Sequence, residues 1–229
     1  MTSLQKWGKS VRTTIPVMAG YLVLGAGFGI LLRTRGYGLG WALAMSAFIY
    51  AGSMQYVAID LLTGGASLLT TAVTTLLVNA RHLFYGISML ERYRAAGKYA
   101  PYLIFSLTDE TYSLVAARED LTGAECFRIS LLDQLYWVLG TALGSLAGAY
   151  LDFNTTGIAF SLTALFLTVF TEQWLETKDH APALIGLGVS IVCRLLFGAD
   201  SFLLPTMGGM LCCLLVLDAR RTKKGGESV

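Results

Sequence analysis

Apolar residues fill long stretches of this chain, and polar residues gather in short breaks between them. Most stretches approach the roughly 20 residues that a helix needs to cross a bilayer. The pattern predicts eight helical segments, at 14–32, 41–62, 66–88, 100–117, 129–150, 157–171, 182–198 and 201–217. We therefore expect an all-α, polytopic membrane protein with seven or eight transmembrane segments. They form one integral membrane domain over residues 1–225, with a polar tail over 220–229.

The composition agrees with this class and excludes others. Of the 229 residues, 55% are hydrophobic and 14% are charged, and the mean hydropathy is +0.60. A soluble domain of this size could not bury so much apolar surface. The net charge of only +2, without a basic stripe, argues against nucleic-acid binding. The cysteines and histidines lack disulfide or zinc spacing, and no catalytic motif occurs, so neither a metal or cofactor nor an enzyme is expected.

Basic residues predict the orientation, because Lys and Arg concentrate in cytoplasmic loops. If all eight segments cross, both termini share one side with the second, fourth and sixth loops. That side carries ten basic residues and the other carries five. Both termini are therefore expected in the cytoplasm. The first segment ends at Arg33 without a small-residue cleavage site, so it is expected to be a retained span and not a signal peptide.

The two halves of the chain share a weak similarity. The pattern Tyr-xxx-Gly-xxx-Gly occurs at 21–29 in the first segment and again at 136–144 in the fifth. Further matches pair Phe48, Gln55 and Tyr56 with Phe166, Gln173 and Trp174, and Arg81, Leu83 and Phe84 with Arg194, Leu196 and Phe197. They predict two repeats, over about 11–117 and 127–217, an architecture common in secondary transporters. The repeats are parallel if all four segments of a half cross, and inverted if one segment is re-entrant.

Two adjacent carboxylates lie deep in the predicted membrane. Asp109 and Glu110 stand at the middle of the fourth segment, about 12–14 Å of helix from either end. An ionised side chain at that depth costs several kcal/mol, and both are too short to reach water. They are predicted to line a water-filled path that binds a substrate ammonium group or carries a proton. In the competing interpretation the segment is an interfacial helix with a wet face.

Other polar residues extend this candidate path. Arg81 and His82 follow Asn79 near the end of the third segment. Arg81 could pair with either acidic residue or with a substrate carboxylate, and His82 titrates near neutral pH. Gln55 lies in an uncharged polar notch that suits a small polar solute. Each has a structural alternative: Arg81 can extend to the interface, His82 can be a helix-end residue, and Gln55 can bridge helices. Asp133 lies closer to a basic loop and is given less weight.

Glycines at four-residue spacing predict close approach of helix backbones. They are Gly25 and Gly29 in the first segment and Gly140 and Gly144 in the fifth. The additional Gly27 favours local unwinding, which would expose backbone N–H groups to an anion. Packing alone is the simpler explanation.

Four motifs resemble the AzlC family in order and spacing over about residues 10–160. They are Gly25-Ala26-Gly27-Phe28-Gly29, the stretch FIYAGSMQY at 48–56, the stretch NARHLFYG at 79–86, and Thr108-Asp109-Glu110-Thr111-Tyr112. The resemblance implies the large subunit of a branched-chain amino acid exporter in the bacterial inner membrane, with a separate small AzlD-type membrane subunit. The expected substrates are leucine, isoleucine and valine, with methionine as a further candidate.

The expected mechanism is secondary transport by alternating access, driven by the proton-motive force. The candidate substrate-binding residues are Gln55, Asn79, Arg81, Asp109, Glu110, Tyr112 and Gly27. The candidate proton-coupling residues are Asp109, Glu110 and His82. Two alternatives stay open: a channel or facilitator for another small polar solute, and a membrane scaffold that transports nothing.

Overall fold

A computed structural model describes residues 3–118, 120–150 and 179–226, together with isolated positions between 157 and 175. Every regular element in these residues is helical, which confirms the all-α prediction. The chain forms two compact units, Met1–Ala164 and Leu165–Val229. This division differs from the predicted halves, because the first helix of the second half lies in the first unit. Most of the predicted segment 157–171 lies outside the described residues.

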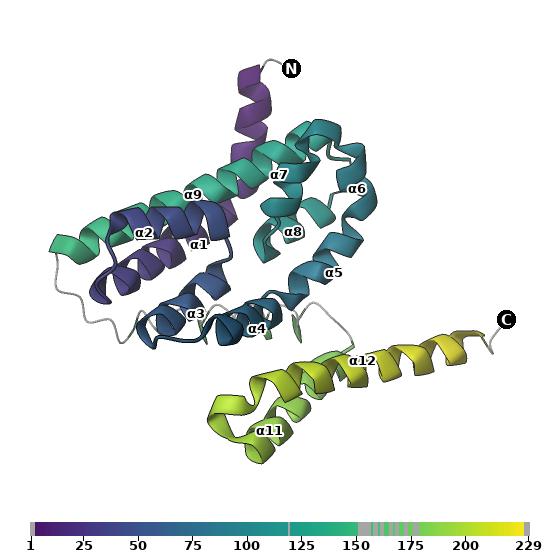
Figure 1. Cartoon of the computed structure of the whole chain (residues 1–229). Helices are drawn as coiled ribbons and strands as arrows, with labels where there is room; N and C mark the ends of the chain where they lie inside the picture. The colour runs from purple at the N-terminus through teal and green to yellow at the C-terminus, as the bar shows by residue number, and fades with distance from the viewer. Residues whose placement is uncertain are drawn as a thin grey trace. The chain divides into compact units, whose positions relative to one another are not determined.

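Two long helices form the centre of the first unit (Figure 1). Helix α1 runs from Ser3 to Thr34 and α9 from Gly123 to Tyr150, and they pack along much of their lengths. Gly25 lies against Gly140, and Gly29, further along α1, lies against Gly144, further along α9. The two helices therefore run parallel, and the predicted close approach at these glycines is confirmed.

Both long helices begin before their apolar runs. Helix α1 begins at Ser3 instead of residue 14, and α9 at Gly123 instead of residue 129. The start of α9 is fixed by a reciprocal cap: the Thr122 N–H donates to the Glu125 carboxylate at 3.0 Å, and the Glu125 N–H donates to the Thr122 hydroxyl at 3.3 Å. Lys9 pairs with Glu125 at 3.6 Å, so the beginnings of the two helices lie together.

The second predicted segment is a hairpin of broken helices and not a straight span. Helices α2 (Leu39–Ala44) and η1 (Met45–Ile49) lead in one direction, and α3 (Gly52–Thr63) returns. The chain reverses at Tyr50 and Ala51, the tip of the first hairpin, where Tyr50 has a left-handed backbone with φ 42°. Asp60, near the end of α3, lies 4.0 Å from Arg35, which precedes α2. Both ends of this hairpin therefore lie beside the carboxyl end of α1.

Three short helices then lead to the opposite end of the α1–α9 pair. They are α4 (Leu68–Val78), α5 (Ala80–Ser88) and α6 (Leu90–Ala95), separated by single residues at Asn79 and Met89. In α6, the Arg92 guanidinium donates to the carbonyl oxygens of Val115 and Arg118. Arg118 in turn donates to the Thr13 hydroxyl at 2.9 Å, near the beginning of α1. This connection therefore runs between the two ends of α1.

A second hairpin starts and ends beside the beginnings of α1 and α9 (Figure 1). It consists of η2 (Gly97–Tyr99), α7 (Ala100–Phe105) and α8 (Asp109–Ala116), and it reverses at residues 106–108, the tip of the second hairpin. At this tip the Thr108 hydroxyl caps α8 by accepting from the Thr111 N–H at 3.3 Å, and it lies 2.6 Å from the Tyr21 hydroxyl. Tyr21 stands near the middle of α1, so the tip reaches the middle of the helix pair.

The two hairpins therefore approach from opposite ends, and their tips meet. The rings of Tyr50 and Phe105 lie 6.5 Å apart, centre to centre. This corrects the expectation of straight spans at 41–62 and 100–117. It also corrects the expected ends of two loops, since 62–66 follows the end of α3 beside the carboxyl end of α1, and 88–100 lies with 117–129 beside the beginning of α1. The hydropathy pattern did not reveal these turns because both reversals use uncharged residues, so the apolar run continues through each turn.

The second unit contains a pair of antiparallel helices, α11 (Ala181–Ser201) and α12 (Leu203–Gly226). Gly186 lies near Met210, and Val189 lies near the preceding Gly209. The backbone of α11 is interrupted at Gly198, whose φ of 74° and ψ of −176° are not helical. Glycine adopts this conformation without the steric cost that a side chain would add.

Among the described residues, two helices are long and apolar enough to cross a membrane, Leu4–Thr34 and Ala181–Gly198. Shorter apolar helices occur at Leu39–Ile49, Leu68–Val78 and Gly208–Leu217. Helix α9 is not one of these two helices, although it is longer than Ala181–Gly198. Its packed face carries buried polar residues. Neither the seven or eight spans nor the internal repeat is confirmed: with 41–62 and 100–117 folded as hairpins, at most six of the eight predicted segments are straight crossings, and the repeat stays a prediction. The parallel, glycine-matched packing of α1 and α9 is what a parallel repeat requires.

Candidate functional site

The first unit has large apolar side chains on its outside, and its interior contains a group of polar side chains beside two apolar clusters. Large apolar side chains that are at least 72% exposed include Phe48, Leu68, Leu69 and Ile87. The buried polar side chains include Ser46, Gln55, Ser106, Thr108, Thr111, Asp133, Thr141 and Ser145. Water would favour the reverse arrangement, because burying a polar group costs free energy unless it is hydrogen-bonded. An apolar exterior suits a lipid environment, and the polar interior lies where the two hairpin tips meet.

A chain of hydrogen-bonding oxygens links two carboxylates in this interior. The Tyr21 hydroxyl donates to Glu110 at 2.7 Å and lies 2.6 Å from the Thr108 hydroxyl. Thr108 donates to Thr111 at 3.1 Å, and Thr111 donates to Asp133 at 2.9 Å. Asp133 is fully buried, and its second oxygen has no hydrogen-bond partner among the described residues. The oxygen chain joins α1, α8 and α9 through the second hairpin tip.

Arg81 and Asp109 form an ion pair beside this interior. The Arg81 guanidinium lies 2.9 Å from the Asp109 carboxylate, and it also donates to the Ser53 hydroxyl at 2.7 Å. The pair joins α5 to the first turns of α8 and α3. About a third of each charged side chain is exposed, so the pair is accessible. The adjacent carboxylate of Glu110 turns instead to Tyr21, so the two acidic residues have different partners, as their angular separation on a helix predicts.

Asn79 and Gln55 lie close to this site in different roles. Asn79 separates α4 from α5, and its buried side-chain oxygen has no hydrogen-bond partner among the described residues. Gln55 is fully buried and donates to Ser46 at 3.1 Å, while its carbonyl accepts from the Trp137 indole at 2.9 Å. Its amide therefore joins η1, α3 and α9. This geometry favours the interpretation of Gln55 as a bridge between helices.

Three other predicted site residues lie outside the meeting point of the tips. The Tyr112 ring stacks on Tyr85 with centroids 4.5 Å apart, and its hydroxyl lies 3.1 Å from that of Ser88. His82 lines a mainly apolar cavity of about 220 Å³ together with α6 and α7 residues such as Ile104. Gly27 is buried within a continuous α1, so the expected unwinding there is wrong. The broken backbone occurs instead at the hairpin tips and at Asn79.

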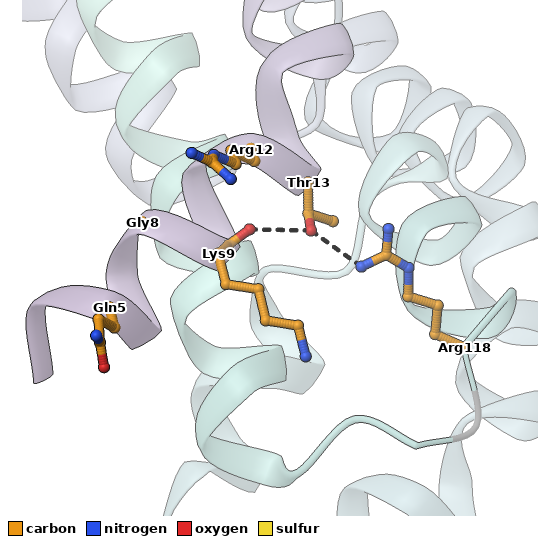
Figure 2. Close-up of a pocket in the computed structure, with 6 residues that line it drawn as sticks. All are labelled: Gln5, Gly8, Lys9, Arg12, Thr13 and Arg118. Carbon is orange, nitrogen blue, oxygen red and sulfur yellow. Dashed lines mark hydrogen bonds between the residues drawn. The ribbon is translucent and has the colours of Figure 1, made fainter. Parts of the chain in front are cut away.

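A second cavity, of about 650 Å³, opens near the beginning of α1 (Figure 2). Thr13 lies in its wall, donating to the Lys9 carbonyl at 3.1 Å and accepting from Arg118 at 2.9 Å. Figure 2 labels the lining residues Gln5, Gly8, Lys9, Arg12, Thr13 and Arg118. The cavity is basic and lies at one end of the α1–α9 pair, away from the hairpin tips. We interpret it as part of the basic surface at that end.

The sequence pattern gave little or no indication of several residues at the centre of this site. Asp133 received low weight because its apolar run starts at 129, yet α9 starts at Gly123, and Asp133 lies about 15 Å along the helix. Thr108 carried a usable signal, because Thr followed by acidic residues is typical of a helix beginning. Tyr21 carried none, since a tyrosine in an apolar run also suits packing.

This architecture defines a class: an all-helical protein with apolar helices of membrane-spanning length, in which broken helices surround a buried polar centre. Residues 16–151 match the model of the AzlC protein family, and this range covers most of the first unit. The chain belongs to the AzlC family, which confirms the resemblance seen in its motifs.

Named relatives extend the match over most of the chain. The branched-chain amino acid transport protein AzlC of Bacillus subtilis is 46% identical over 209 residues, which cover 89% of this chain and 82% of that protein. An uncharacterized membrane protein of Haemophilus influenzae is 42% identical, covering 92% and 87%. The inner membrane protein YgaZ of Escherichia coli is 26% identical, covering 90% and 87%. These names support a membrane location. No solved structure matches the chain.

Proposed function

We propose that this chain is the large subunit of a transporter that exports branched-chain amino acids from the bacterial cytoplasm. Its substrates are leucine, isoleucine and valine, with methionine as a further candidate. The observation that carries the proposal is the accessible Arg81–Asp109 ion pair, held where the first turns of two broken helices meet. The name of the Bacillus subtilis relative supports the choice of substrate.

The ion pair is complementary to a zwitterion. Arg81 can bind the substrate carboxylate, and Asp109 can bind the ammonium group, so that the substrate replaces one ion pair by two. Helix α3 adds a second group of donors, because the first N–H groups of a helix have no intrahelical partner. Its N-cap residue, Ala51, has no side-chain oxygen to satisfy them. Ser53, in the first turn of α3, is already bonded to Arg81, so these donors lie beside the guanidinium.

The hairpins also suggest a membrane topology. In this proposal α1, the α4–α6 connection and α9 cross the membrane, and the two hairpins are re-entrant. The end of the pair where α1 begins then carries the basic residues Lys6, Lys9, Arg12, Arg92, Arg94, Lys98, Arg118 and Arg128. The other end of this region carries Arg33 and Arg35. This bias is stronger than the one counted for eight straight spans, and it supports an amino terminus in the cytoplasm. We place the carboxyl terminus there as well.

Export requires an energy source and, in this proposal, a partner. The partly buried carboxylate of Glu110 and the fully buried carboxylate of Asp133 support coupling to the proton-motive force by alternating access. We propose that a small AzlD-type membrane subunit completes the transporter in the inner membrane. The large apolar side chains on the outside of the first unit suit both lipid and such a partner.

Counterflow of leucine tests the proposed function. This chain and the proposed small subunit are reconstituted together in proteoliposomes, and protein-free liposomes are the control. Radiolabelled leucine is added outside. We expect saturable uptake that unlabelled leucine inside accelerates and that isoleucine and valine compete for. Flux without acceleration would indicate a channel. A complete absence of flux, with the small subunit present, would indicate a scaffold.

A further inference from the structure

Glu110 and Asp133 are the ends of an unbroken line of oxygen atoms. From Glu110 the line passes through the hydroxyls of Tyr21, Thr108 and Thr111 and ends at Asp133. The four contacts measure 2.7, 2.6, 3.1 and 2.9 Å in that order. Each is within hydrogen-bond distance.

Counting hydrogen atoms shows that this line requires one more proton than its hydroxyls supply. Each hydroxyl has a single hydrogen, and an ionised carboxylate only accepts. With both carboxylates ionised, only three hydrogens are available for the four contacts between oxygen atoms. In one of the four contacts the two oxygens then face each other without a hydrogen between them. An unsatisfied buried contact of this kind is costly. One added proton supplies the fourth hydrogen and satisfies every contact.

We propose that Glu110 and Asp133 share this one proton through the three hydroxyls, and that the shared proton is the coupling ion of the transporter. With the proton on Glu110, the hydrogen bonds run Glu110 to Tyr21, Thr108, Thr111 and the Asp133 carboxylate. When Glu110 gives its hydrogen to Tyr21 and each hydroxyl passes its own hydrogen one position onward toward Asp133, the proton resides on Asp133 and Glu110 is ionised. The O–H bond lost at one carboxyl is gained at the other, and the net charge of the line stays at −1.

The position of this proton determines the charge of Glu110, which lies beside the proposed substrate site. Glu110 directly precedes Thr111 and directly follows Asp109, so its charge lies next to the proposed ammonium acceptor. Asp133 lies on α9, at the other end of the line. The other titratable or charged groups that face this line lie on the first hairpin tip, α5, α7 and α8, and they are Tyr50, Arg81, Tyr85, Tyr102 and Asp109. Arg81 and Asp109 compensate each other in charge, so the shared proton sets the net charge of the centre.

Two substitutions interrupt the line in different ways. Tyr21→Phe removes one hydroxyl and keeps both carboxylates, whereas Asp133→Asn removes one end. The matched control is Tyr136→Phe, which removes a hydroxyl on α9 that lies 3.2 Å from the Thr14 hydroxyl and does not belong to the line. If Asp133→Asn fails to fold, Tyr21→Phe still tests the inference.

Infrared difference spectroscopy of the purified protein detects the shared proton directly and does not require transport. We expect a protonated-carboxyl band at neutral pH that Asp133→Asn abolishes, Tyr21→Phe shifts and Tyr136→Phe leaves in place. A spectrum without a protonated carboxyl, or one that neither Tyr21→Phe nor Asp133→Asn alters, would overturn the shared proton.

The number of protons moved per leucine tests its role as coupling ion, and this inference rests on the proposed function. We expect about one proton per leucine in the parent protein and in Tyr136→Phe and a ratio at least about tenfold lower in Tyr21→Phe, because proton transfer by a positioned side chain is typically worth about 10²–10⁴-fold in rate. An unchanged proton-to-leucine ratio in Tyr21→Phe would overturn the coupling role. If the parent protein moves no leucine, the proposed function fails, while the infrared result still decides whether the proton is shared.

Discussion

Replacing Gly144 by alanine is expected to separate α1 from α9 and to destabilise the protein strongly. A Cβ atom at Gly144 would overlap the backbone of Ala26, with its Cα at 2.5 Å and its carbonyl oxygen closer still. A Cβ at Gly29 would lie 2.6 Å from the backbone nitrogen of Ser145. Backbone atoms cannot rotate away as a side chain can. Overpacking costs about 1–3 kcal/mol in general, and we expect the upper end of that range or more for Gly144→Ala and Gly29→Ala.

Thermal unfolding of the purified protein measures this effect. For a chain of this size, 3 kcal/mol corresponds to a fall in melting temperature of roughly 6–12 °C. Gly20→Ala is the matched control, because Gly20 lies in the same helix as Gly29 and a Cβ there would meet no atom within 4 Å among the described residues. This control should be neutral or slightly stabilising, since alanine favours a helix over glycine by about 1 kcal/mol. Equal melting temperatures for Gly144→Ala and Gly20→Ala would show that the two helices do not pack at these glycines.

Neutralising either member of the Arg81–Asp109 pair is expected to abolish most leucine transport. The two side chains are 2.9 Å apart and join α5 to α8, and in the proposed function each binds one end of the zwitterion. Removing one partner of a close charge pair costs about 2–5 kcal/mol when the pair is desolvated, and less here because both side chains are about a third exposed. We therefore expect Asp109→Asn and Arg81→Gln each to raise the leucine concentration for half-maximal flux about 10- to 100-fold.

Two further variants separate a substrate-binding role from a structural one. The double variant Arg81→Gln/Asp109→Asn leaves no unpaired charge, so it should regain stability. It should not regain transport, because both ligands for the zwitterion are missing. Asp60→Asn is the matched control, since it neutralises an aspartate in the more exposed pair with Arg35 and should change little. Recovery of leucine flux in the double variant would mean that the pair serves the fold alone.

The sequence was sufficient for the class of the protein and for part of its centre. Long apolar runs predict membrane helices whatever their contacts, and the matched glycines predicted where two of the helices touch. Asp109, Glu110 and Arg81 were identified because ionised groups are costly inside a membrane, and a costly group in an apolar run is easily recognised. The structure brings these three residues to the meeting point of the hairpin tips.

The hairpins could not be predicted in the same way. A run of about 20 apolar residues has the same hydropathy whether it crosses the membrane or turns back halfway. The turn at Tyr50 is made by a left-handed residue that is not glycine, and the turn at 106–108 contains neither glycine nor proline. Such a reversal depends on contacts with other segments, here with Tyr21 on α1. The same dependence hid Asp133, whose burial comes from the second hairpin packing against α9.

The opposed hairpins are tested most directly by measuring on which side of the membrane two positions lie. Ser67 follows the first hairpin and Lys98 lies in η2 at the start of the second; both are exposed, and each is replaced by cysteine in a variant without the four native cysteines. In eight straight spans Ser67 faces the cytoplasm and Lys98 faces the outside. With two opposed hairpins their sides are exchanged. A membrane-impermeant maleimide added to intact cells should therefore label Ser67→Cys and should label Lys98→Cys only after the membrane is opened. Labelling of Lys98→Cys alone in intact cells would contradict the opposed hairpins and the site that their tips form.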